Sequence, residues 1–123
     1  MTFVQRSTVT LQTDSSSGST SYSETLNGLF HAMHYVRDST GTALSTAMGL
    51  TVTGEESGIT FFSMSPFNST VDATFMPRGP LHLSTAGTTA AGVDRLPLVH
   101  ERLKLVASSG GANKSGTFRF FVG

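Results

Sequence analysis

The stretch LNGLFHAMHYVRD, residues 26–38, decides the fold of this chain, because its pattern fits both a helix and a strand. A helix would gather four apolar side chains on one face: Leu26, Leu29, Phe30 and Met33. Ser21 and Glu24, just upstream, have the spacing of a helix capping box. On such a helix His31 and His34 would share a face and could chelate a metal ion.

A strand is the favoured interpretation of this stretch. Gly28 would cost a helix about 1 kcal/mol relative to Ala, and the sequence His-Tyr-Val near the end prefers strands. The segments on both sides have β patterns, and sequential strands usually pair. On a strand, a separation of three residues puts His31 and His34 on opposite faces. We therefore expect the two histidines to point apart and to bind no shared ion.

Strict alternation assigns every residue of this strand to one of two faces. One face would carry Leu29, His31, Met33 and Tyr35, and the other Phe30, Ala32, His34 and Val36. Both faces are largely apolar, which predicts an inner strand that is covered on both sides.

The rest of the chain consists of short β patterns separated by turn signals. Strands are expected at residues 3–12, 20–26, 50–53, 59–64, 70–75, 101–107 and 117–122. The clearest hairpin joins LTVT and ITFFSM through GEESG, residues 54–58. In the segment 70–75, Val71, Ala73 and Phe75 would share a face, and SSGGANKSG, residues 108–116, is interpreted as a hairpin turn.

These patterns predict a single domain over residues 1–123. The expected fold is all-β: an antiparallel β-sandwich, jelly-roll-like, or a barrel. Nine phenylalanines and no tryptophan fit a core built of aromatic and β-branched residues between two sheets. The last expected strand reaches almost to Gly123, which predicts that this end of the chain is held in a sheet.

Composition excludes several classes of function. The chain has no cysteine, so disulfides, thiolate zinc sites and cysteine nucleophiles are excluded. The formal net charge is zero and 13% of residues are charged, so no nucleic-acid binding is expected. A protein surface with a net charge near zero promotes association with other proteins. No apolar run approaches the roughly 20 residues that span a bilayer, and MTFVQRSTVT has no apolar signal core, so neither membrane insertion nor secretion is expected.

No motif indicates catalysis. The histidines, His31, His34, His82 and His100, match no metal-binding spacing, and HAMH lacks the glutamate of HExxH. A G-x-S-x-G elbow is absent, and GGANKSG has Asn113 where a phosphate loop needs Gly before the lysine. We therefore expect no enzyme, no catalytic or metal-binding residues and no cofactor. Glu55 and Glu56 are interpreted as solvated turn residues, with a calcium or partner contact as the alternative.

Residues 77–95 form a long stretch without periodicity, and loops of this length are uncommon in compact domains. The candidate partner contacts in this stretch are Arg78, Leu81, His82 and Leu83. Arginine and apolar side chains often dominate interfaces, whereas the alternative is a loop that covers one end of the sandwich. Phe3, in the N-terminal segment, is a further candidate contact.

Five segments carry a resemblance to a known family: residues 35–38, 53–59, 77–82, 101–104 and 110–118. The order of LNGLFHAMHYVRD, LTVTGEESGI, MPRGPLH, HERLKLV and GGANKSGTFRFFVG resembles small virion structural proteins of tailed bacteriophages. The match spans most of the chain. Its motifs are structural, so the family has no catalytic residues to transfer.

The resemblance implies a capsid decoration, or cement, protein that binds and stabilises the major capsid shell. Its partners would be the major capsid protein or other virion proteins. It would be located in the virion, which is assembled in the bacterial host cytoplasm. The favoured oligomeric state would be a homotrimer. The alternative is a neck, tail or fibre-associated β-sandwich module that binds another virion protein, a carbohydrate or a receptor. Carbohydrate sites usually use exposed aromatic residues, and for these the chain offers Tyr22 and Tyr35.

Overall fold

The computed structural model describes residues 4–16, 18–38, 43–67, 69, 71–82 and 89–123. The described residues form strands and no helix, which confirms the all-β prediction. The strands are β1 (Gln5–Gln12), β2 (Ser19–Arg37), β3 (Gly49–Gly54), β4 (Thr60–Met64), β5 (Ala73–Phe75), β6 (Gly79–His82), β7 (Thr89–Asp94), β8 (Pro97–Ser108) and β9 (Ser115–Val122).

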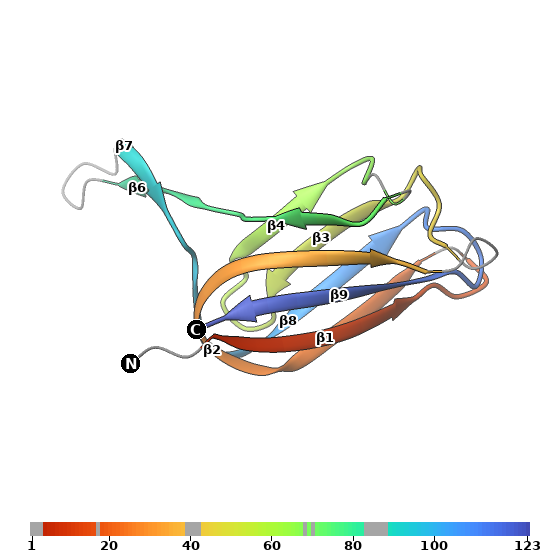
Figure 1. Cartoon of the computed structure of the whole chain (residues 1–123), viewed down its shortest axis with the longest axis horizontal. Coiled ribbons are helices and arrows are strands. Elements are labelled where there is room, and N and C mark those ends of the chain that lie inside the picture. The colour runs from red at the N-terminus through yellow and green to blue at the C-terminus, as the bar shows by residue number, and fades with distance from the viewer. Residues whose placement is uncertain (1–3, 17, 39–42, 68, 70, 83–88) are drawn as a thin grey trace.

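Seven of these strands form one antiparallel sheet that folds over into two layers (Figure 1). One layer has the order β1-β9-β2-β5, and the other has the order β2-β8-β3-β4. Strand β2 belongs to both layers, because its first half pairs with β8 and its second half with β9 and β5. The predicted sandwich is therefore one sheet whose two layers share a strand.

The strand interpretation of residues 26–38 is confirmed, since the whole stretch 19–37 is β2. The segments expected at 20–26 and 26–38 are thus a single element that turns a corner at Gly28. Gly28 has φ +129°, and next to it Leu29 and Gly123 exchange backbone hydrogen bonds of 3.3 and 3.0 Å. The pairing with β8 shifts register between Leu26 and Gly28. Bulges of this kind let a strand pass from one layer of a sandwich to the other.

A second irregularity follows the corner and changes which side chains face the core. The register between β2 and β9 shifts between Phe30 and Ala32, so His31 lies in a bulge. Strict alternation would place the side chain of Phe30 on the face opposite to that of Met33 and Tyr35. All three side chains are nevertheless fully buried in the core. The predicted face assignment is therefore wrong, because the extra residue in the bulge reverses the alternation. β2 lies inside its layer, with β9 and β5 paired to its two edges. The expected cover on both faces is not found, because Ala32, His34 and Val36 on the other face are only half-buried.

The core lies between the layers and is rich in aromatic rings. Phe30 stacks on Phe61 at 5.3 Å between ring centroids, which joins β2 to β4 across the sandwich. Phe67, between β4 and β5, contacts the rings of Tyr35, Phe62, Phe75 and Phe118 at 5.1 to 6.1 Å. The remaining core side chains come from the inner face of each strand. In β9, for example, these are the buried residues Phe118, Phe120 and Val122.

The connection between β8 and β9 differs from its prediction. SSGGANKSG was expected to be a hairpin turn, yet β8 and β9 lie in different layers, so the segment crosses between them. Ser109, Gly111 and Asn113 adopt positive φ. Thr13 holds the crossing, because its hydroxyl accepts the Lys114 N–H at 2.8 Å and donates to the Gly111 carbonyl. Glycine-rich segments suit both kinds of connection, and only the long-range pairing distinguishes them.

The strand expected at 70–75 is shorter than predicted. Only Ala73–Phe75 is a strand, and Val71 lies outside it with 54% of its surface exposed, so Val71 does not extend the half-buried face of Ala73 and Phe75. Asp72 accepts the backbone N–H of Arg37 at 2.8 Å, which brings the segment onto the edge of β2 before the strand begins. β8, by contrast, is longer than expected and starts at Pro97.

Candidate functional site

Residues 77–95 were predicted as a loop without regular structure, and this prediction is wrong. β6 and β7 form a separate two-stranded antiparallel sheet, with Gly79 opposite Asp94 and His82 opposite Thr89. We call this hairpin the arm. It projects from the end of the sandwich at which the C-terminus lies (Figure 1). Glycines and Pro80 interrupt the alternation of this segment, so its sequence carries little strand signal.

The predicted contact residues lie in or beside the arm where the structure describes them. Leu81 and His82 belong to β6, whose backbone alone is described. Phe3 and Leu83 lie outside the described residues. Arg78 is exposed and directly precedes β6, and its Nη1 donates to the backbone carbonyls of His31 at 3.0 Å and Pro77 at 2.7 Å. Arg78 therefore connects the start of the arm to the bulge in β2.

The end of the arm is held at the same bulge. The Nδ1 atom of His31 lies 3.0 Å from Nη1 of Arg95, which directly follows β7. The Nε2 atom of His31 lies 2.9 Å from the carbonyl oxygen of Gly123, next to β9. Phe30 directly precedes His31, and Leu96 directly follows Arg95. The backbone N–H of Phe30 donates to the carbonyl of Leu96 at 2.8 Å. The bulge thus brings together both ends of the arm and the last residue of the chain.

Three exposed apolar side chains lie on segments that meet at this end. Val4, Met76 and Val99 are 52%, 66% and 71% exposed. Val4 precedes the pair Gln5–Val122, and Met76 follows the pair Met33–Phe75. Single exposed apolar residues are common, but here they lie around the base of a projecting hairpin. Sequence patterns did not reveal them as a group, because they come from three distant segments.

Strained backbone lies beside the most exposed of these residues. His100 has φ +49°, a conformation that is uncommon for a residue other than glycine. It faces the register shift of β2, and its N–H donates to the Asn27 side chain at 3.3 Å. Val99, immediately before it, is thereby placed on the surface. Strain of this kind clusters at functional positions.

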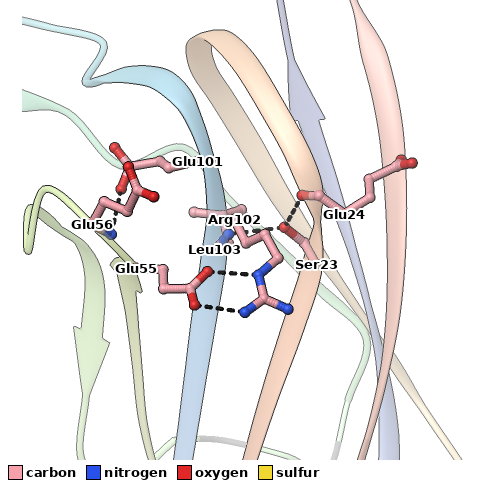
Figure 2. A network of polar contacts seen from close by, with 7 residues as sticks. All are labelled: Ser23, Glu24, Glu55, Glu56, Glu101, Arg102 and Leu103. Atoms are coloured by element: carbon pink, nitrogen blue, oxygen red, sulfur yellow. Dashed lines mark hydrogen bonds and ion pairs between the residues drawn. The ribbon is translucent and has the colours of Figure 1, made fainter.

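A second polar cluster holds the GEESG turn against β8 (Figure 2). Glu101 is 4% exposed, and its Oε1 accepts the Ser57 hydroxyl and the backbone N–H groups of Glu56 and Ser57 at 3.1 to 3.2 Å. Burial raises the pKa of Glu101, but these bonds and one from the backbone of Val99 outweigh it, so the pKa lies below its ordinary value. Glu101 has the phase of the buried residues Leu103 and Leu105, so the alternation of this strand is the sequence signal that places its carboxylate on the inner face.

In the part of the chain that the structure describes, Glu55 and Glu56 do not gather with Glu101 as a metal-binding group. Both oxygens of Glu55 accept from Arg102 at 2.6 Å, and hydrogen bonding to Arg102 lowers the pKa of Glu55. The guanidinium of Arg102 in turn lies 4.3 Å from the ring centre of Tyr22. On the neighbouring strand β2, the Ser23 hydroxyl accepts the Leu103 N–H and donates to the Glu24 carbonyl, as Figure 2 shows. The cluster therefore stabilises a turn.

The two histidines of the opening stretch have separate partners. His31 contacts Gly123 and Arg95, whereas Nδ1 of His34 lies 2.8 Å from the Thr74 hydroxyl at the β5 edge. No three histidine or acidic side chains gather as a metal-binding group in the described part of the chain. Over the same residues no pocket is found. Nor does any described segment form a helix with the length and apolar character to cross a membrane.

Fold and site together define an all-β protein whose most prominent surface feature is an arm with its two ends fixed at a bulge. Comparisons with protein-family models, with curated proteins and with solved structures gave no match for this chain.

Proposed function

We propose that this chain is a bacteriophage virion structural protein, a capsid decoration protein whose arm binds a neighbouring virion protein. The observation that carries the proposal is that, among the described residues, β6 and β7 pair with each other and with no strand of the sandwich. A two-stranded hairpin on its own is marginally stable in water. An arm that docks on a partner gains a surface against which to pack, and both of its edge strands offer backbone groups for pairing.

The surroundings of the arm fit a contact of modest affinity that is repeated many times. Val4, Met76 and Val99 supply apolar surface beside its base. Only 13% of the residues are charged, so burial of the protein surface removes few charges from water. On a shell with many equivalent sites, several weak contacts made together give strong retention. The major capsid protein is the partner that this proposal names.

The neck, tail or fibre alternative uses the same arm with a different partner. Its carbohydrate-binding version has little support from the aromatic residues. Tyr35 is fully buried, and Tyr22, 42% exposed, lies against the Arg102 guanidinium. Cryo-electron microscopy of particles separates the two proposals, since density over the shell supports decoration and density at the neck or tail supports the alternative.

The test is the composition of purified virions from a phage that carries this gene. We expect mass spectrometry to detect the wild-type chain at a fixed ratio to the major capsid protein. A variant in which residues 79–94 are replaced by a short Gly-Ser linker should be absent from particles, although its seven-stranded sheet is retained. The matched control is Glu24→Gln, an exposed change on β2, which should be incorporated like the wild type. Absence of the wild-type chain from virions would overturn the proposal.

A further inference from the structure

His31 contacts three segments that are far apart in the sequence. Its ring lies 2.9 Å from the Gly123 carbonyl through Nε2 and 3.0 Å from Arg95 through Nδ1. Its own backbone carbonyl accepts from Arg78 at 3.0 Å. Arg78 precedes β6 and Arg95 follows β7, so this one residue touches the chain at both ends of the arm. The position of the arm on the sandwich therefore depends on His31.

The chemistry of these partners determines the tautomer of the ring. A neutral imidazole has one N–H donor and one acceptor nitrogen. A guanidinium can only donate, so Nδ1 must accept from Arg95. The Gly123 carbonyl can only accept, so Nε2 must carry the hydrogen. Both contacts form together only when His31 is neutral and protonated at Nε2.

We propose that His31 is the positioning residue of the arm, and that protonation of its ring releases the arm at Arg95. In the imidazolium form both ring nitrogens donate. Nδ1–H would then face a guanidinium N–H across 3.0 Å, so the hydrogen bond is lost and two positive groups repel each other. The bond to Gly123 survives, because Nε2 donates in both forms.

The groups around His31 confine the effect to the arm. Among the described residues, the charged side chains in contact with His31 are Arg95, from the connection after β7, and Arg78, from the segment before β6. β9 contributes the carbonyl of Gly123. The backbone bond from Phe30 to Leu96 does not titrate and holds the chain one residue after Arg95. Movement is therefore expected in β6 and β7 and not in β8.

Such a junction gives the arm two states, one for each charge of the His31 ring. With the ring neutral, the arm is held at its base by both Arg78 and Arg95. With the ring protonated, the contact with Arg95 is lost, whereas Arg78 still donates to the backbone carbonyl of His31. These contacts lie within one molecule, so the two states do not depend on the proposed virion function.

NMR on the full-length ¹⁵N-labelled chain tests the inference directly. Long-range ¹H–¹⁵N spectra should show His31 protonated at Nε2 near pH 8. On acidification to about pH 5, the order parameters of β6 and β7 should fall to below about 0.6. This fall should share its midpoint with the His31 titration, while β8 and β9 remain rigid.

Three variants separate His31 from the other groups that titrate. In His31→Gln the arm should show the same mobility at both pH values, whereas the control His34→Gln should keep the wild-type response. Arg95→Ala should give a mobile arm even near pH 8, and it decides the question if His31→Gln fails to fold. An Nδ1–H tautomer near pH 8, an arm unaffected by the His31 titration, or a pH response retained in His31→Gln would each overturn the proposal.

Discussion

At the scale of single residues, Gly28 permits the corner on which the two layers depend. Its φ of +129° lies in a region that L side chains rarely adopt. A Cβ at this position would lie 2.9 Å from the carbonyl carbon and 3.0 Å from the Cα of Gly123. Both neighbours are backbone atoms that take part in the bonds between Leu29 and Gly123. Gly28 argues against a helix in the sequence, but its need for positive φ is visible only in the fold.

We predict that Gly28→Ala lowers the free energy of unfolding by about 3 kcal/mol, because backbone strain and a steric clash add. The matched control is Gly58→Ala. Gly58 also has positive φ, +72°, but no atom lies within 4 Å of the added Cβ, so strain alone should cost about 1 kcal/mol. Urea unfolding measures both. Equal losses in the two variants would show that the close approach to Gly123 has no energetic effect.

At the scale of elements, the hairpin of β3 and β4 shows how a local prediction can be right and incomplete. LTVT, GEESG and ITFFSM identify the hairpin, and β3 pairs with β4 as expected. The turn itself is held by Glu101, which is distant in sequence and buried. Gly54 leaves the room that this carboxylate needs, since a Cβ there would lie 2.2 Å from it. Three hydrogen bonds offset the burial of a charge that would otherwise be costly.

We predict that Glu101→Gln lowers the free energy of unfolding at pH 7 by about 2 kcal/mol, since a neutral amide oxygen accepts the same hydrogen bonds more weakly than a carboxylate. The effect should depend on pH. The pKa of Glu101 is lower in the folded chain than its ordinary value of 4.5, so its contribution is fully present above about pH 4.5. That contribution is lost as the pH falls through the folded-state pKa, so the variant and the wild type should converge in acid.

Urea unfolding at about pH 7 and pH 3 measures this difference. Glu55→Gln is the control, because its ion pair with Arg102 is exposed and exposed pairs contribute little. A gap between wild type and Glu101→Gln that stays constant down to pH 3 would contradict the assigned role of the carboxylate.

The arm is the element that the sequence did not reveal. Its strands contain Gly79, Pro80 and Gly92, and they lack the apolar alternation that marks a strand packed on a core. A hairpin that projects from the sandwich has no need of that alternation. The absence of that pattern predicted a loop, and the prediction is wrong because these strands do not pack on a core.

At the scale of the whole molecule, stability depends on the aromatic core that joins the two layers. Phe67 is fully buried, and its ring contacts lie on both layers. Its backbone N–H donates to the carbonyl of Met48 at 2.6 Å, which fixes the connection after β4. The sequence predicts a phenylalanine-rich core but does not identify this residue, because Phe67 lies outside every strand.

We predict that Phe67→Ala lowers the free energy of unfolding by about 3 to 5 kcal/mol, owing to lost burial and the cavity left behind. Proteins of this kind are stable by about 5 to 15 kcal/mol, so the loss is a large share of the total. Phe121→Ala is the control, since Phe121 is half-buried and does not belong to the core. Thermal and urea unfolding should show a clearly smaller loss for Phe121→Ala, and similar losses would contradict the role of Phe67.

The sequence by itself determined the all-β class, most strand positions and the strand at residues 26–38. These depend on alternation, glycine placement and β-forming residues, all of which act over a few neighbouring positions. The tertiary structure alone decided that β2 serves both layers, that the bulge at His31 turns Phe30 inward, and that Arg78 and Arg95 meet at that bulge. These features arise from pairing between distant segments, and a bulge of one residue leaves no mark on the local pattern that alternation could detect.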